Sequence, residues 1–304
     1  MTMGLTGYDG PIERDHPIGP LTTYRFGGPA AFYAEVPDAE ALRSVLGAGR
    51  AEGLPLLILG RGSNVVISDR GFEGLVVRLS GAFLAIEMDD HTATAGAAAS
   101  LPRLARETVG NGRGGLEWCV GIPGSVGGAV RMNAGGHGSD TAEWHVSARV
   151  LDARTLAITD MTVADLDLRY RHSALTDAQV VTSATFRTTS QERAVGEEKL
   201  REITRWRREH QPGGTFNAGS VFKNPAGDAA GRLIDEVGLK GFRIGGAMVS
   251  HRHANFFEAD RTASAQDVFD LVAEVARRVA AATGVQLEPE IRFVGEFERS
   301  GGRR

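Results

Sequence analysis

Short glycine loops recur along the first half of this chain. The sequence holds 40 glycines against 11 prolines, about twice the usual share of glycine. The glycines form no low-complexity tract but gather at residues 60–62, 110–115, 121–128, 135–136 and 245–246. Because glycine lacks a Cβ, it permits positive φ and close approach to the backbone. Any one cluster can be a tight turn, whereas the several clusters of the first half together favour a ligand lying along exposed backbone.

Composition excludes several other classes of protein. Of the residues, 42% are hydrophobic and 24% are charged, which is ordinary for a soluble globular protein. A net charge of -4 gives no reason to expect a nucleic acid or an anionic membrane as partner. The single cysteine, Cys119, excludes an internal disulfide and a Cys-rich zinc site. No apolar run reaches the roughly 18 residues of a membrane span. We therefore expect a cytoplasmic protein without an obligate protein partner.

Hydrophobic periodicity predicts an α+β chain. Strands are expected over 31–36, 54–59, 65–67, 75–79, 83–87 and 289–297, with further strands between 145 and 187. Helices are expected after Asp38, from Ser100, and over 197–210, 228–237 and 264–284. The last helix has the strongest pattern, because Ser264 and Asp267 resemble a capping box and Gly284 ends the apolar stripe. Residues 1–20 read as an irregular arm.

The first glycine loop of interest follows an apolar strand. It comprises Gly60, Arg61, Gly62, Ser63 and Asn64. It lacks the third glycine of a dinucleotide fingerprint, and a β-like segment rather than a helix follows it. No P-loop sequence occurs. The remaining interpretation is a nest of N–H groups, with the Ser63 hydroxyl, that suits a pyrophosphate.

A second loop of the same kind spans residues 121–128. It contains Gly121, Gly124 and Gly128 with the hydroxyl of Ser125, and it continues to Asn133. Two such nests suit an extended, phosphate-bearing cofactor better than a compact one. Two tight β-turns are the alternative.

Three polar segments carry the remaining chemistry. They are YRHS at 170–173, GSVFKNP at 219–225 and LEPEIRF at 287–293. No G-x-S-x-G elbow occurs, so Ser220 is not expected to be a nucleophile, although its hydroxyl can donate a proton. The YRHS segment could equally be the end of a surface strand, and LEPEIRF, taken alone, reads as a solvated strand face. His251 and His253 lack nearby cysteines, and no metal site is expected.

Together these segments resemble one enzyme family, the UDP-N-acetylenolpyruvoylglucosamine reductases, also called UDP-N-acetylmuramate dehydrogenases. The match is ordered and extends over nearly the whole chain, from TTYRFGGPA at 22–30 to LEPEIRF at 287–293. The GSVFKNP and LEPE segments are its most specific parts. The chain's shortness resembles the subgroup without an extra substrate-covering loop.

The resemblance implies an α+β fold of three parts. Two α+β subdomains, over 1–90 and 91–195, would form an FAD-binding region of the vanillyl-alcohol-oxidase (PCMH) type. A smaller α+β substrate-binding domain would span 196–288. The last strand, within 289–297, could join the first subdomain.

The resemblance also implies the reaction. NADPH would reduce non-covalently bound FAD, which passes hydride to C3 of the enolpyruvyl group of a UDP-sugar in peptidoglycan precursor synthesis. Arg171 and Glu290 would be catalytic, and Ser220 would donate the proton to C2. The cofactor contacts would be Gly60, Arg61, Gly62, Ser63, Asn64, Gly121, Gly124, Ser125, Gly128 and Asn133. The substrate contacts would be Lys223, Asn224 and Arg292.

Two rival interpretations share the fold. One is a flavin- or nucleotide-binding module that lost its chemistry, and the presence of Arg171, Ser220 and Glu290 argues against it. The other is an oxidase with covalently bound flavin, which the C-terminal GSVFKNP and LEPE segments do not suit. Release of the flavin on denaturation and turnover of NADPH would separate these alternatives.

Overall fold

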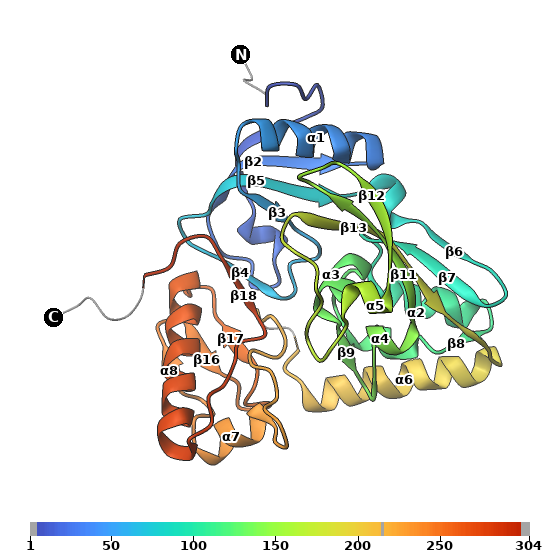
Figure 1. Cartoon of the computed structure of the whole chain (residues 1–304). Coiled ribbons are helices and arrows are strands. Elements are labelled where there is room, and N and C mark those ends of the chain that lie inside the picture. Colours follow the sequence, from blue (N-terminus) through green and yellow to red (C-terminus); the bar gives the residue numbers. More distant parts are fainter. Residues whose placement is uncertain (1–4, 214–215, 299–304) are drawn as a thin grey trace. The chain divides into compact units, whose positions relative to one another are not determined.

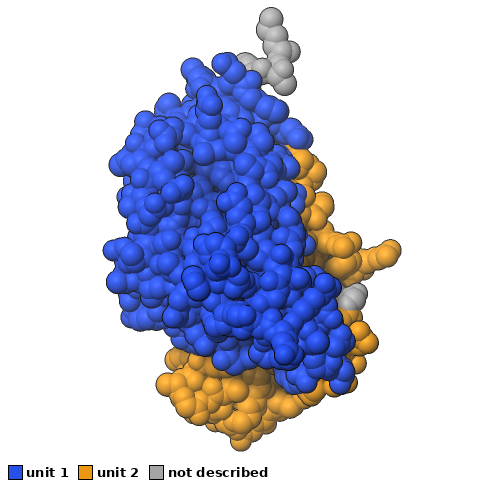
Figure 2. Space-filling model, turned by 90° about the vertical axis from the view of Figure 1, so that its right-hand side faces the viewer, with its two compact units in different colours: residues 1–14, 32–61, 74–207 blue, residues 15–31, 62–73, 208–304 orange. Residues whose placement is uncertain are grey.

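The chain forms two compact units, each assembled from separate stretches of sequence. The computed structural model describes residues 5–213 and 216–298 (Figure 1). Unit 1 comprises residues 1–14, 32–61 and 74–207, and unit 2 comprises residues 15–31, 62–73 and 208–304 (Figure 2). Both contain helices and strands, so the predicted α+β class is confirmed. The predicted division at residues 90 and 195 stays a prediction.

A four-stranded sheet contains the first strands of the chain. Its order is β1 (Glu13–Pro17), β2 (Pro29–Val36), β5 (Phe72–Leu79) and β3 (Leu56–Ile58). Helix α1 (Ala39–Ala51) lies beside it in Figure 1. The apolar stripe of α1, at Leu42, Val45 and Leu46, packs in one core with Leu75 and Val77. As predicted, Asp38 caps the helix, because its carboxylate accepts the Ala41 N–H at 2.9 Å.

Unit 1 also contains a five-stranded antiparallel sheet. Its order is β12 (Ile158–Thr162), β11 (His145–Asp152), β13 (Gln179–Arg187), β7 (Thr92–Gly96) and β6 (Ile86–Met88). The apolar side chains of α2 (Leu101–Gly110), η3 (Glu117–Gly121) and α3 (Val126–Met132) share a core with this sheet. Shorter elements are η2 (Gly81–Leu84), α4 (Thr141–Trp144), α5 (Val163–Leu166), and the strand pairs β8 (Arg113–Gly114) with β14 (Thr189–Ser190) and β9 (Gly135–Gly136) with β10 (Ser139–Asp140). Helix α6 (Arg193–His210) follows them.

Unit 2 has one core that draws on all three of its stretches. An antiparallel sheet contains β15 (Arg243–Ile244), β16 (Ala247–Val249) and β17 (Phe257–Ala259). Helix α8 (Ala265–Thr283) lies against this sheet, and α7 (Ala230–Glu236) contacts α8. The last strand, β18 (Arg292–Val294), pairs in parallel with β4 (Val65–Ile67). Tyr24 is fully buried here, and its hydroxyl donates to the Phe257 carbonyl at 2.9 Å.

Helix α8 has the predicted ends and one further anchor. Ser264 and Asp267 form the capping box, and Gly284 ends the helix at φ +76°. In addition, the carboxylate of Asp69 accepts the N–H groups of Ala265 and Gln266 at 2.9 and 3.0 Å. This contact joins residues distant in sequence, so local patterns could not predict it.

Other expectations need correction. Within the described part of residues 1–20, the expected irregular arm contains β1 and the 3-10 helix η1 (Gly19–Leu21). The strand expected over 83–87 is instead η2 followed by β6. The glycines at 245–246 form a turn against α8, because the Gly246 N–H donates to Asp267 at 3.0 Å and a Cβ on Gly245 would lie 2.3 Å from that carboxylate. This cluster is therefore a tight turn, which is the interpretation that the sequence allowed for any single cluster.

Candidate active site

In unit 2, two of the predicted catalytic residues lie on adjacent, hydrogen-bonded segments. The Glu290 N–H donates to the carbonyl of Val221, the residue after Ser220, at 2.7 Å. Two positions on, the Lys223 N–H donates to the Glu288 carbonyl at 2.9 Å. The GSVFKNP and LEPE segments therefore run side by side and bring Ser220 and Glu290 together.

Asn64 holds the Glu290 segment from its other side. Its Nδ2 donates to the Glu290 carbonyl at 3.0 Å, and its own carbonyl accepts the Arg292 N–H at 2.9 Å. Sequence reasoning placed Asn64 among the cofactor contacts, which stays a prediction. In the structure its side-chain amide contacts the chain, and it fixes the backbone of a proposed catalytic residue.

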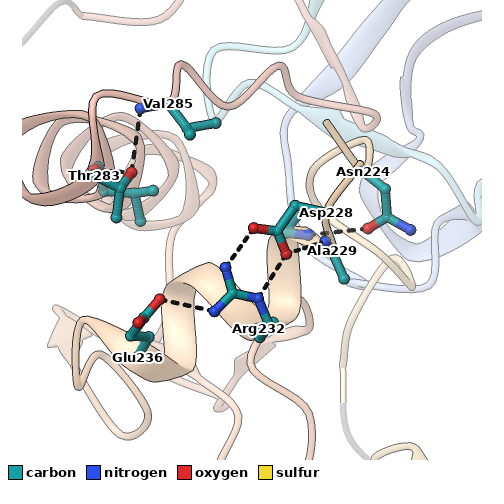
Figure 3. Close-up of polar contacts among 9 residues, drawn as sticks. Asn224, Asp228, Ala229, Arg232, Glu236, Thr283 and Val285 are labelled. Carbon is teal, nitrogen blue, oxygen red and sulfur yellow. Dashed lines mark hydrogen bonds and ion pairs between the residues drawn. The ribbon is translucent and has the colours of Figure 1, made fainter. Parts of the chain in front are cut away.

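The predicted substrate residues flank this pair. The Lys223 ammonium pairs with Glu288 at 2.6 Å. Asn224 Oδ1 accepts the Ala230 N–H at 3.1 Å, where α7 begins (Figure 3). Nearby, Asp228 is paired with Arg232, whose hydrogen bonds lower the pKa of that carboxyl to about 2. Arg292 is exposed on β18. These contacts hold the loop of residues 223–228 against the start of α7.

In unit 1, the structure brings the two predicted cofactor loops into contact. A Cβ on Gly60 would lie 2.6 Å from the Ser125 hydroxyl. That hydroxyl accepts the Gly128 N–H at 3.3 Å and so caps α3. The Val126 and Gly127 amides each donate to backbone carbonyls, at 2.9 Å, so they belong to the fold. The absent Cβ at Gly60 leaves a cradle beside a buried hydroxyl, which fits a phosphate-bearing cofactor.

The other loop residues have differing surroundings. Gly62 has φ +63°, and a Cβ there would lie 2.5 Å from the Thr22 Cα. A side chain at Gly62 would therefore disturb the chain itself, whatever it does to a ligand. A Cβ on Gly121 would lie 2.5 Å from the His137 ring. Three further predicted contacts are also placed: the Gly124 carbonyl accepts the Leu101 N–H at 3.1 Å, Arg61 is exposed and Ser63 is half-buried.

Asn133 is buried at the C-terminus of α3 and organises the segment that carries Arg171. It is 1% exposed and adopts φ +39°. Its Nδ2 donates to the Arg169 carbonyl at 2.9 Å, and its Oδ1 accepts the Ala142 N–H at 2.9 Å. The predicted cofactor contact stays a prediction, because the contacts seen for this side chain are with the chain itself.

Arg171 lies in a tight turn with an unusual backbone conformation. Arg169 and His172 exchange backbone hydrogen bonds at 3.1 and 3.0 Å, and Arg171 between them has φ +52°. Its Nη2 donates to the Gly135 carbonyl at 2.8 Å, and its guanidinium lies 5.0 Å from the centroid of the Tyr170 ring. Left-handed φ in a non-glycine residue costs about 1–3 kcal/mol and clusters at functional sites. Arg171 belongs to unit 1, whereas Ser220 and Glu290 belong to unit 2.

Sequence reasoning missed one residue of the Ser220 neighbourhood. Asn255 is 3% exposed, and its side-chain amide bonds both the N–H and the carbonyl of Phe222. The available signal was a polar residue inside the apolar run Ala254-Asn-Phe-Phe257.

Comparisons with known proteins agree with this architecture. A family model described as an FAD binding domain matches residues 30–158, and one described as the C-terminal domain of UDP-N-acetylenolpyruvoylglucosamine reductase matches residues 211–294. UDP-N-acetylenolpyruvoylglucosamine reductase 2 of Symbiobacterium thermophilum is 42% identical over 94% of this chain and 93% of its own length. The chain belongs to the UDP-N-acetylenolpyruvoylglucosamine reductase family.

Two further members of the reductase family extend the comparison. The reductase of Synechococcus sp. strain RCC307 is 43% identical over 95% of this chain and 96% of its own length. The crystal structure of the reductase from Thermus caldophilus is 35% identical, has a TM-score of 0.80, and covers 94% of this chain and 99% of that one. The predicted family, fold class and FAD-dependent reductase function are thereby confirmed.

Among residues 5–213 and 216–298, no helix is long and apolar enough to cross a membrane. Over the same residues, no group of three or more His, Cys, Asp or Glu side chains is arranged to hold a metal ion.

Proposed function

We propose that this reductase acts in the cytoplasm on the enolpyruvyl group of UDP-N-acetylglucosamine-enolpyruvate, with NADPH as co-substrate, and forms UDP-N-acetylmuramate. The observation that carries the proposal is the pairing of the Ser220 and Glu290 segments through Val221. This pairing joins the segments that carry a hydroxyl and a carboxyl, and both lie in the region that matches the reductase C-terminal model, which supports the proposal.

The cofactor is held by unit 1 in this proposal. Gly60 gives backbone access, and the hydroxyl of Ser125 offers a donor to the diphosphate. When bound, FAD carries hydride from NADPH to C3 of the enolpyruvyl group. The protein supplies position and electrostatics for that transfer.

Arg171 stabilises the charge that develops on the substrate carboxylate. A hydride added at C3 leaves negative charge on the C2–carboxylate system, and a guanidinium matches a carboxylate in geometry and charge. The turn at 169–172 and the bond to Gly135 orient the guanidinium before substrate binds. Such preorganised donors need no rearrangement at the moment of reaction.

Ser220 completes the reaction by donating its hydroxyl proton to C2, and solvent then returns a proton to the serine oxygen. Glu290 polarises the same carboxylate, either as the protonated acid or through a hydrogen-bond network. Lys223, Asn224 and Arg292 contact the UDP-sugar around this pair. General acid catalysis of this kind typically contributes about 10²–10⁴ in rate.

Rapid-mixing spectroscopy on Ser220→Ala tests the assignment, because the two half-reactions have different needs. Flavin bleaching by NADPH needs no proton at C2, so it should stay within about twofold of wild type. Reoxidation by the enolpyruvyl UDP-sugar should slow by about 10²-fold or more. Ser220→Cys, which can also give up a proton, should recover part of that rate. Slow bleaching with normal reoxidation would instead assign Ser220 to cofactor binding.

A further inference from the structure

Asn255 makes three hydrogen bonds to the two residues that follow Ser220. Its carbonyl accepts the Val221 N–H at 2.8 Å. Its side-chain Oδ1 accepts the Phe222 N–H at 2.9 Å, and its Nδ2 donates to the Phe222 carbonyl at 2.8 Å. One side chain therefore satisfies both polar groups of a single residue, as a neighbouring β-strand would.

These bonds form where strand pairing stops. Ser220 pairs with Phe256 only as an isolated bridge, and Phe222 pairs with Pro289 in the same way. Around the Phe222–Pro289 bridge, the hydrogen bonds run from the Lys223 N–H to Glu288 and from the Glu290 N–H to Val221. The N–H and carbonyl of Phe222 itself therefore face the other edge, where no regular strand pairs with them. A carboxamide carries both a donor and an acceptor and can replace the missing strand partner.

Burial makes this arrangement hard to replace. Asn255 is 3% exposed and Phe222 is 1% exposed, so the Phe222 groups would not find water if the amide were removed. A buried backbone group without a partner is costly, and the backbone would shift to regain one. Ser220 lies two residues away. The residue before it, Gly219, has φ +76°, and its N–H donates to Asn217 Oδ1 at 3.0 Å, so Asn217 restrains the near end of the segment and Asn255 its far end.

We propose that Asn255 is the positioning residue for Ser220. The inference rests on the proposed role of Ser220 as proton donor. Asn255 fixes one edge of the segment at Phe222, and Glu290 fixes the other edge at Val221. The backbone that carries Ser220 is therefore held from both sides, next to the Glu290 segment. Asn255 itself contacts neither substrate nor cofactor in this assignment.

The first measurement separates positioning from general stability. A displacement of about 1 Å can slow a reaction by roughly 10²-fold. In Asn255→Ala, reoxidation by the enolpyruvyl UDP-sugar should therefore slow by about 10- to 100-fold, whereas NADPH bleaching stays within about twofold. Leu271→Ala is the matched control, because Leu271 is fully buried in the same core. It should lower the melting temperature and leave the ratio of the two rates unchanged.

A double-variant cycle then tests whether the effect passes through Ser220. In a Ser220→Ala background, Asn255→Ala should slow reoxidation no further, because the group that it positions is already gone. If the two substitutions slow reoxidation by the product of their separate factors, the inference is wrong. It is also wrong if Asn255→Ala slows flavin bleaching and reoxidation equally. Normal reoxidation in Ser220→Ala alone would overturn the proposed function and this inference with it. Slow reoxidation in Ser220→Ala but not in Asn255→Ala would overturn only the inference.

Asn255→Asp decides the case if the alanine variant does not fold. The aspartate keeps an oxygen that accepts the Phe222 N–H. Its second oxygen replaces the Nδ2 donor and repels the Phe222 carbonyl oxygen, unless the carboxyl is protonated and can donate to it. Burial favours the protonated form, so the reoxidation rate relative to wild type should rise as pH falls. His253, whose Nδ1 accepts the Asn255 N–H at 3.2 Å, is present in both proteins. A ratio that does not change with pH would overturn the inference.

Discussion

Three asparagines hold the backbone beside the proposed catalytic residues. Asn133 donates to the Arg169 carbonyl, Asn64 donates to the Glu290 carbonyl, and Asn255 bonds both polar groups of Phe222. Each amide replaces a peptide partner at a place where regular pairing has ended. At the scale of single residues, the position of each proposed catalytic side chain thus depends on an amide that need not touch the substrate.

The first prediction concerns Arg171. Arg171→Ala should keep its flavin but lose about 10²–10³ in turnover, as is typical for removal of one charge-stabilising donor. Lysine should recover only part of the rate, because it lacks the planar fork. Arg171→Gly is the control for the backbone: φ +52° suits glycine, so this variant should be at least as stable as the alanine variant and equally slow. Turnover near that of the wild type in both the alanine and the glycine variant would show that Arg171 is an ordinary residue of a surface turn.

His145 should make stability depend on pH. It is 3% exposed, its ring lies 6.0 Å from that of Phe186, and burial lowers the pKa of its imidazole to about 4. As pH falls, His145 is protonated at a higher pH in the unfolded chain than in the folded protein. The free energy of unfolding therefore decreases as pH drops from about 6.5 toward 4.

The measurement for His145 is a difference between two proteins. From pH 7 to pH 5, the loss in unfolding free energy should be about 2 kcal/mol larger for wild type than for His145→Phe, which has no proton to gain. Urea titrations at both pH values give the two free energies, and carboxyl groups common to both proteins cancel. Equal losses would show that His145 stays neutral in the unfolded chain or is already charged in the fold.

At the scale of elements, the sequence predicted a helix or turn where the residues that fix it are neighbours in the chain. Helix α8 begins and ends where Ser264 and Gly284 indicated, because a cap is made by neighbours in sequence. Its anchor at Asp69 and the turn at 245–246 depend on residues distant along the chain, so no local pattern could indicate them. The two glycine loops were identified from sequence, but the contact between Gly60 and Ser125 was not.

That contact supports a prediction about the cofactor. A methyl group on Gly60 would lie 2.6 Å from the Ser125 hydroxyl. Overpacking of this kind typically costs about 1–3 kcal/mol. If the whole cost lowers cofactor binding, FAD affinity falls by roughly 5- to 150-fold. Flavin fluorescence titration of Gly60→Ala measures this loss.

A second substitution identifies the cause. Ser125→Gly alone should weaken FAD binding, because it removes a proposed donor and the cap of α3. Adding Gly60→Ala to it should cost less affinity than Gly60→Ala costs in the wild type, because the clashing hydroxyl is already gone. Gly110→Ala is the control, because nothing lies within 4 Å of a Cβ at that position. If Gly60→Ala binds FAD normally, the cradle at Gly60 is not part of the cofactor site.

At the scale of the whole molecule, the family and the α+β class followed from ordered motifs. The predicted bounds at residues 90, 195 and 288, with the last strand joining the first subdomain, stay predictions. In the structure, unit 2 comprises residues 15–31, 62–73 and 208–304. Local patterns cannot indicate which distant stretches share a core. Tyr24 and Val66 both lie in the core of unit 2 with Phe222 and Phe257, and these packing contacts join distant parts of the sequence.

The last prediction follows from that assembly. The segment 208–304, expressed alone, should not fold cooperatively. It would lack two fully buried side chains, Tyr24 and Val66, the β4 partner of β18, and the Asp69 carboxylate that caps α8. Removing a single large core side chain typically costs about 2–5 kcal/mol, which is comparable to the whole stability of a small domain.

Thermal unfolding followed by circular dichroism tests this expectation. The isolated segment should show a broad, shallow transition, and its amide NMR signals should be poorly dispersed. The control is the chain expressed as two pieces, 1–213 and 214–304, which together hold every stretch of unit 2. These pieces should assemble and unfold with a sharp transition. A sharp transition in the isolated segment would instead mean that residues 208–304 hold a complete core of their own, and that Tyr24 and Val66 only extend it.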